Sequence, residues 1–163
     1  MDVWWQEVTN IVRQEFSDLP DAAGVIRITL RLLIASILGG ILGFEREQKG
    51  KAAGLRTHML VSLGAALFVL IPQQAGVSDA DLTRVLQGLV TGVGFLGAGT
   101  IIKGAGEEEI KGLTTAANIW LTAAIGVAAG MGREATAVLS TLIALVILYM
   151  GPKIARWFEN RER

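Results

Sequence analysis

Seven polar residues beside long apolar runs are the best candidates for a functional cluster: Glu45, Arg46, Arg56, Thr57, Thr114, Thr115 and Asn118. Side chains of these types form ion pairs, cap helices or bind polar ligands. The chain has no Cys and a single His, His58, which excludes thiolate chemistry and a multi-histidine metal site. No catalytic triad and no paired carboxylates occur within the apolar runs. We therefore predict a non-enzymatic protein with no cofactor and no metal site.

Charged residues near the ends of the apolar runs need partners. Arg31 lies about a turn and a half inside the first run, where it either snorkels outward or pairs with Glu134 or with an acid of the 79–81 segment. At the other end of that run, Glu45 and Arg56 are placed to pair across a polar turn, and Thr57 is placed to cap the next helix. A structural staple of this kind is favoured over a binding site.

Glycines recur four residues apart in three places, Gly39–Gly43, Gly88–Gly92 and Gly126–Gly130. In a membrane helix this spacing allows two backbones to approach closely, within a bundle or across a dimer. A denser glycine track comprises Gly92, Gly94, Gly97 and Gly99. Its G-x-G-x-x-G spacing resembles a dinucleotide fingerprint, but it lies inside an apolar run and lacks the acid that the fingerprint requires about 20 residues later. Close packing is favoured, and a locally unwound path for an ion stays open.

Five apolar runs carry these residues, at about 25–44, 58–72, 85–102, 113–131 and 135–150. A span of the hydrocarbon core needs about 20 mostly apolar helical residues, and the runs lack the alternation of half-buried strands. We therefore predict an all-α membrane protein with five transmembrane helices in a glycine-rich bundle.

Basic residues alternate with these runs. Ten fall in the segments expected on one side: Arg46, Lys49, Lys51, Arg56, Lys103, Lys111, Lys153, Arg156, Arg161 and Arg163. Five fall in the opposite segments: Arg13, Arg27, Arg31, Arg84 and Arg133. The positive-inside rule then puts the N-terminus outside and the C-terminus in the cytoplasm. The net charge of zero and the absence of a basic stripe argue against a nucleic-acid partner.

The segment 1–24 differs from the runs. Its apolar residues recur at three- and four-residue steps: Trp4, Trp5, Val8, Ile11, Val12, Phe16 and Leu19. This pattern is typical of an amphipathic helix lying in the membrane–water boundary, here on the periplasmic side, and Pro20 then provides a break. We thus expect three parts: this interfacial helix, a five-span domain over 25–151, and a short basic cytoplasmic tail over 152–163.

The motifs together resemble the MgtC/SapB family of bacterial membrane proteins. The resemblance covers about residues 27–130 and rests on three stretches, "RLLIASILGGILGFEREQKGKAAGLRTHMLVSLGAALF", "GVGFLGAGTIIK" and "GLTTAANIWLTAAIGVAAG". It implies a multi-span protein of the bacterial inner membrane, linked to survival in low Mg²⁺, to virulence and to restraint of the F-type ATP synthase. Many members carry a C-terminal regulatory domain of the ACT type. This chain ends at Arg163, so that domain is expected to be absent.

Two functions stay open at this stage. The first is a non-enzymatic regulator of another membrane complex, with the F-type ATP synthase as one such complex, active in low Mg²⁺ or acid stress. The second is a small oligomeric transporter or channel for Mg²⁺ or another cation, with the glycine track along its path. The expected partners are the lipid bilayer, a second copy of the chain in a homodimer or larger homo-oligomer, and a membrane protein complex.

Overall fold

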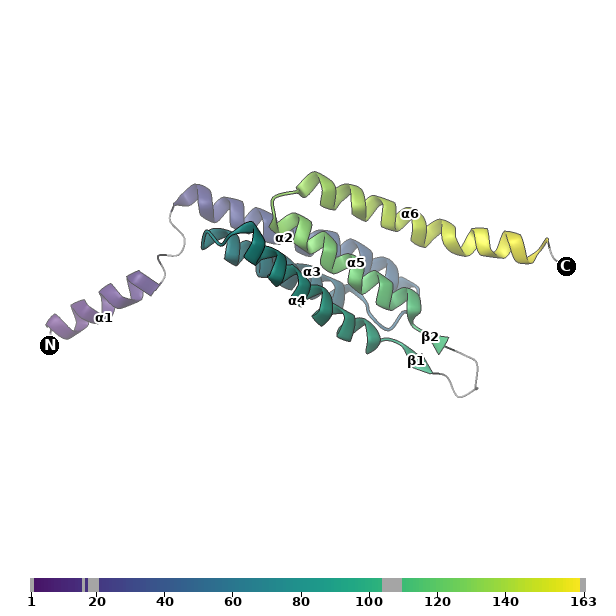
Figure 1. The fold of residues 1–163 in the computed structure, drawn as a ribbon, viewed down its shortest axis with the longest axis horizontal. Coiled ribbons are helices and arrows are strands. Elements are labelled where there is room, and N and C mark those ends of the chain that lie inside the picture. The colour runs from purple at the N-terminus through teal and green to yellow at the C-terminus, as the bar shows by residue number, and fades with distance from the viewer. Residues whose placement is uncertain (1, 16, 18–20, 104–109, 162–163) are drawn as a thin grey trace. The chain divides into compact units, whose positions relative to one another are not determined.

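The computed structural model describes residues 2–15, 17, 21–103 and 110–161 (Figure 1). The chain divides into two compact units, Met1–Leu30 and Arg31–Arg163. The elements in chain order are α1 (Asp2–Glu15), α2 (Ala22–Gln48), α3 (Leu55–Gln74), α4 (Asp79–Ala98), β1 (Ile102–Lys103), β2 (Ile110–Lys111), α5 (Leu113–Gly130) and α6 (Glu134–Glu159). The predicted helical class is confirmed, with one addition, since the two-residue strands β1 and β2 pair antiparallel between α4 and α5.

In the first unit, the amphipathic pattern forms a helix, α1. Trp4 and Trp5 stack edge to face at a centroid distance of 4.7 Å, and both are exposed. Exposed tryptophans on an amphipathic helix suit a membrane boundary, and that location stays a prediction. Phe16, Leu19 and Pro20, which also supported it, lie outside the described residues.

Among the residues that the structure describes, four helices are long and apolar enough to cross a membrane: Ala22–Gln48, Leu55–Gln74, Leu113–Gly130 and Glu134–Phe158. They match the first, second, fourth and fifth predicted runs. The third run corresponds to α4, which is not among the four. Asp79, Asp81 and Arg84 occupy its first two turns, and the helix ends at Ala98 rather than at Ile102, so its apolar stretch is shorter than the prediction had it.

Within the second unit, α3 lies at the centre together with α5. It packs along most of its length against α5, as the two ribbons side by side in Figure 1 show, and its other neighbours are α4 and the 31–48 part of α2. Leu38, Leu42, Ala66, Ile125 and Ala129 form a core between α2, α3 and α5, which α6 closes with Ala137 and Ala144. A second core joins α3, α4 and α5 around Ala65, Val93, Ile119 and Ala123.

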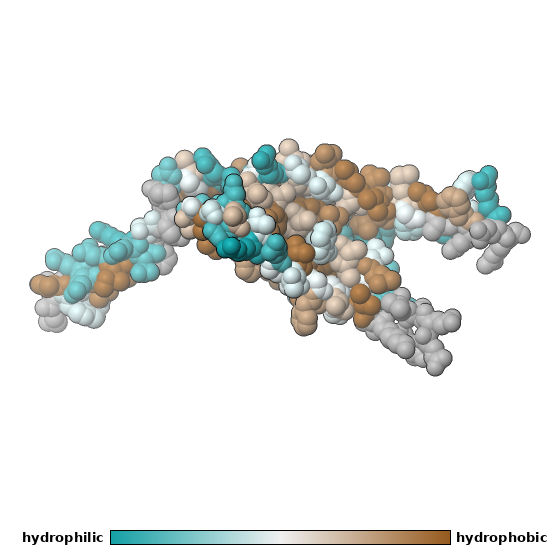
Figure 2. Space-filling view, in the orientation of Figure 1, coloured by the Kyte–Doolittle hydropathy of each residue, from teal (hydrophilic) through white to brown (hydrophobic). Residues whose placement is uncertain are grey.

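The outward surfaces of these helices are apolar. Figure 2 shows hydrophobic residues gathered along α6, where Leu139, Ile143 and Ile147 are all more than half exposed. Exposed leucine and isoleucine in such numbers are unfavourable in water and favourable in lipid. The surface thus agrees with a membrane protein.

The connection between the β1–β2 hairpin and α5 requires a glycine. Gly112 starts α5 with a φ of 98°, a conformation that L side chains rarely adopt, and a Cβ there would overlap the carbonyl of Thr100. Only glycine therefore fits where the β1–β2 hairpin meets α5. The acidic residues Glu107, Glu108 and Glu109 of this hairpin lie outside the described residues.

Candidate functional site

The polar turn between α2 and α3 is closed by Glu47. Its carboxylate oxygen Oε2 accepts a hydrogen bond of 2.7 Å from the backbone N–H of Leu55, the first residue of α3. Gly54 occupies the N-cap position and has no side chain, so Glu47 satisfies one of the free amides that every helix start leaves. Thr57, predicted as the cap, is exposed and lies inside the helix.

Two glycines of α2 bring its backbone against α3. A Cβ on Gly39 would lie 2.6 Å from the carbonyl oxygen of His58, and one on Gly43 would lie 2.8 Å from that of Gly54. The helices therefore approach without intervening side chains, as the four-residue spacing predicted. This close approach buries His58 completely, at 0% exposure.

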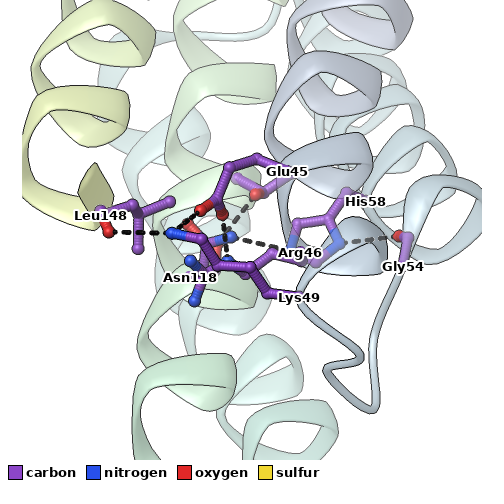
Figure 3. Close-up of polar contacts among 8 residues, drawn as sticks. Glu45, Arg46, Lys49, Gly54, His58, Asn118 and Leu148 are labelled. Carbon is purple, nitrogen blue, oxygen red and sulfur yellow. Dashed lines mark hydrogen bonds and ion pairs between the residues drawn. The ribbon is translucent and has the colours of Figure 1, made fainter. Parts of the chain in front are cut away.

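His58 makes two hydrogen bonds that define its tautomer (Figure 3). Nδ1 lies 2.8 Å from the carbonyl oxygen of Gly54, and Nε2 lies 3.0 Å from Nδ2 of Asn118 on α5. A carbonyl oxygen only accepts, so Nδ1 carries the hydrogen and Nε2 accepts from the Asn118 amide. One neutral imidazole satisfies both contacts and connects the start of α3 to α5.

Further buried polar groups continue this pair along α3 and α5. Thr122 donates its hydroxyl hydrogen to the carbonyl of Asn118 at 2.8 Å, and Thr115 is 3% exposed. Ser62, one turn after His58, is fully buried, and its hydroxyl oxygen has no hydrogen-bond partner among the described residues. A Cβ on Gly126 would overlap the Ser62 carbonyl, so α5 also contacts α3 backbone to backbone here.

An ionic group lies at the same end of the bundle, on the last turn of α2. Glu45 pairs with Arg46 and with Lys49, the latter at 2.6 Å between Oε1 and Nζ. The predicted pair of Glu45 with Arg56 is therefore wrong, because Arg46 on α2 and Lys49 just after it lie within reach of Glu45, and Arg56 is exposed. Arg46 is only 3% exposed, so its guanidinium is buried beside the Glu45 carboxylate, which also pairs with Lys49.

Lys49 also connects α2 to α6. Its ammonium group donates to the carbonyl oxygen of Leu148 at 3.3 Å. That carbonyl lacks its usual helical partner, because the residue four positions later is Pro152, which has no N–H. Lys49 thus donates to the Leu148 carbonyl the hydrogen bond that Pro152 cannot donate.

Arg31, predicted to lie within a span, is paired at the opposite end of the bundle. Its Nε lies 3.7 Å from Oε1 of Glu134, and its NH1 donates to the carbonyl of Gly130 at 3.1 Å. The Glu134 alternative is thereby confirmed, and Asp81 pairs instead with Arg84 at 2.7 Å. This pair connects the first residues of α6 to α2.

The three glycine pairs with four-residue spacing differ in whether they pack against a neighbouring helix. Gly39–Gly43 and Gly126–Gly130 pack against α3 backbone, whereas a Cβ on Gly88 or Gly92 would meet nothing within 4 Å. Gly94 is equally open, a Cβ on Gly97 would lie 3.5 Å from the Cβ of Ala116, and one on Gly99 would lie close only to the end of its own helix. Gly88 and Gly92 line an apolar groove of about 470 Å³, the α3/α4 groove, formed by Leu60, Val61, Gly64, Ala65, Phe68, Gly88, Leu89, Gly92, Val93 and Leu96.

The structure thus brings together Glu45, Arg46 and Asn118 with His58 (Figure 3). Thr115, on α5, is buried as well. Arg56, Thr57 and Thr114 are exposed. From the sequence alone, His58 and Lys49 had no role beyond that of the single histidine and of one of the ten basic residues expected on one side. A signal for His58 was present, because His58, Ser62, Ala65, Ala66 and Val69 form one helical stripe, all of it buried.

Comparison with known proteins places these features in a family. The family model described as "MgtC family" matches residues 32–157. The chain belongs to the MgtC family. This segment contains the paired glycines, the His58–Asn118 contact and the Lys49–Leu148 contact.

Several curated MgtC-family relatives are similar over most of this chain. "Protein SrpB" of Synechococcus elongatus is 41% identical over 132 residues, which is 74% of this chain and 72% of that protein. "Putative magnesium transporter YhiD" of Escherichia coli is 42% identical over 127 residues, 73% of this chain and 58% of that protein. "Protein MgtC" of Brucella abortus is 42% identical over 113 residues, 69% of this chain and 46% of that protein. The chain therefore spans only part of each relative, and no solved structure matches it.

Proposed function

We propose that this MgtC-family protein is a non-enzymatic protein of the bacterial inner membrane that regulates another membrane complex during adaptation to low Mg²⁺ or acid stress. The observation that carries the proposal is the α3/α4 groove. It is apolar, and its α4 wall has two glycines, four residues apart, at which an added Cβ would meet nothing within 4 Å in the described chain.

The contrast with the other glycine pairs supports a docking role. Gly39–Gly43 and Gly126–Gly130 each hold a neighbouring helix of this chain at backbone contact. The same spacing at Gly88–Gly92 is unused, and small residues in a membrane helix are the means by which a second helix approaches closely. A transmembrane helix of a partner complex fits this wall, and the F-type ATP synthase is the complex that the family resemblance puts first.

The proposal includes a five-span topology, in which α4 crosses the membrane in addition to α2, α3, α5 and α6. Asp79, Asp81 and Arg84 then lie at its outer end, Lys51 and Lys111 on the cytoplasmic side, and α1 at the periplasmic surface. Asp79 and Asp81 belong to the first turn of α4, which Ser78 caps, so they suit a helix end in water. Residues 152–159 continue α6 as its basic cytoplasmic end.

The test is ATP-driven proton pumping in inverted membrane vesicles that hold F-type ATP synthase, with and without this protein. We expect wild type to lower the pumping rate and Gly92→Leu to abolish that effect by filling the groove. Gly94→Leu is the matched control, because Gly94 is also open and lies on α4 but does not line the groove. Equal pumping with and without the wild-type protein would rule out this complex as the target.

A second function, Mg²⁺ transport by a homo-oligomer, is supported by the name of the Escherichia coli relative. There a second copy of the chain would fill the groove, and the glycine track would line a path at the subunit contact. Purified protein in liposomes loaded with a Mg²⁺ indicator decides between the two. Flux that Gly92→Leu abolishes and Gly94→Leu preserves would establish the transporter and overturn the regulator.

A further inference from the structure

A second cavity, the basic pocket, opens at the end of the bundle where α2 ends and α5 begins. It measures about 720 Å³ and is lined by Arg46, Lys49, Lys51, Thr114, Ile147, Leu148, Tyr149, Gly151, Pro152, Lys153 and Arg156. Five of these residues are cations and none is an acid. They come from α2, from the turn after it and from the second half of α6, so tertiary packing assembles the charge.

The positive charge of the pocket is only partly neutralised. Glu45 pairs with Arg46 and Lys49. Among the residues whose side chains are described, no carboxylate pairs with Lys51, Lys153 or Arg156. Lys153 lies 3.8 Å from the centroid of the Tyr149 ring, and Arg156 donates to the carbonyl of Pro152 at 3.1 Å. These contacts orient the two cations without cancelling their charge.

The start of α5 adds to the positive electrostatic potential of the basic pocket. Thr114, its second residue, lines the pocket, and α5 has no side-chain cap. The amides of an uncapped helix start carry partial positive charge and favour an anion nearby. The pocket therefore combines side-chain cations with backbone N–H donors.

The depth of the pocket in the bilayer suggests the source of the anion. A helix that starts at Glu134 covers a hydrocarbon core of about 30 Å in about 20 residues, which puts Lys153 and Arg156 at the level of the lipid headgroups. Just before them, Ile147 and Tyr149 are more than 60% exposed. The pocket thus presents an apolar wall on its membrane side and cations at its polar end.

We propose that the basic pocket binds the phosphate headgroup of an anionic phospholipid, with the acyl chains lying along Ile147 and Leu148. Lys51, Lys153 and Arg156 contact the phosphate, while Lys49 stays engaged with Glu45 and Leu148. A free phosphate ion would use the cations but leave the apolar wall unused. The amphipathic lining therefore favours lipid as the source.

The test is native mass spectrometry of the purified full chain in detergent, titrated with phosphatidylglycerol or with phosphatidylcholine. We expect wild type to retain phosphatidylglycerol selectively. Lys51→Gln combined with Lys153→Gln should weaken retention by roughly thirtyfold, since each surface lysine contributes about a factor of five toward an anionic lipid. Arg56→Gln combined with Arg161→Gln is the matched control, because it removes two cations from residues that do not line the pocket.

Circular dichroism verifies that each variant is folded. The possible outcomes then distinguish the proposal from its alternatives. Selective retention by wild type and by the control pair, lost in the pocket pair, supports the proposal. Equal retention by both pairs, or equal retention of both lipids by wild type, overturns it. Displacement of phosphatidylglycerol by millimolar inorganic phosphate would assign the site to a free anion and overturn the lipid source.

Discussion

Nδ2 of Asn118 donates to Nε2 of His58 at 3.0 Å, across 60 residues of sequence and between two helices with apolar surroundings. Both side chains are less than 5% exposed. A buried polar group without a partner costs about 1–3 kcal/mol, while a net hydrogen bond between membrane helices averages about 0.6 kcal/mol. The contact thus matters more for specifying how α3 meets α5 than for overall stability.

A double-mutant cycle on this pair should show coupling. His58→Leu and Asn118→Leu each leave one buried polar atom unpaired. The sum of the two single losses in unfolding free energy should therefore exceed the loss in the double variant by about 1 kcal/mol. Unfolding by sodium dodecyl sulfate in mixed micelles measures this. Thr114→Val, an exposed neighbour on α5, should stay within about 0.5 kcal/mol of wild type. Additive single effects would show that the hydrogen bond contributes nothing.

The packed glycines should be far more sensitive to substitution than the open ones. Gly126→Ala forces a methyl group onto the Ser62 carbonyl, which should lower unfolding free energy by about 1–3 kcal/mol. Gly64→Ala, on α3 with no atom within 4 Å of the new Cβ, should be neutral or stabilising by up to about 1 kcal/mol. Thermal unfolding in detergent compares them, and equal destabilisation of both variants would contradict the backbone contact.

Lys49 and Pro152 should be energetically coupled through Leu148. In the wild-type background, Lys49→Met leaves the Leu148 carbonyl without a donor and should cost about 1–2 kcal/mol. In a Pro152→Ala background, the restored N–H bonds that carbonyl within α6, so the same change should cost less than half as much. The lost ion pair with Glu45 is common to both backgrounds and cancels. An equal cost in both would mean that Lys49 acts only through Glu45.

Single-cysteine labelling should determine the topology, because the chain has no cysteine of its own. Val77→Cys, before α4, should react with a membrane-impermeant maleimide in intact spheroplasts. Ile101→Cys, after α4, and Lys51→Cys should react only after permeabilisation. Labelling of both Val77→Cys and Ile101→Cys in intact spheroplasts would mean that α4 does not cross the membrane.

Much of the helical framework follows from local sequence patterns. Runs of apolar residues near the length of a bilayer crossing predicted α2, α3, α5 and α6, and the three- and four-residue steps after Met1 predicted α1. These features depend on hydrophobicity and helical periodicity, which are properties of each segment alone. The run over about 85–102 predicted a helix at α4, but the helix extends over Asp79–Ala98 and begins with the charged residues Asp79, Asp81 and Arg84.

The choice of partners was decided by the tertiary structure. Three glycine pairs have the same spacing, yet two hold α3 and one stays open, because only packing determines which helix face meets a neighbour. Arg56 was the expected partner of Glu45, but Glu45 pairs with Arg46 on its own helix and with Lys49 directly after that helix. The contacts of His58 with Asn118 and of Lys49 with Leu148 depend on the rotation and axial offset of whole helices. Those quantities arise from the summed packing of the bundle, so no single stretch of sequence contains them.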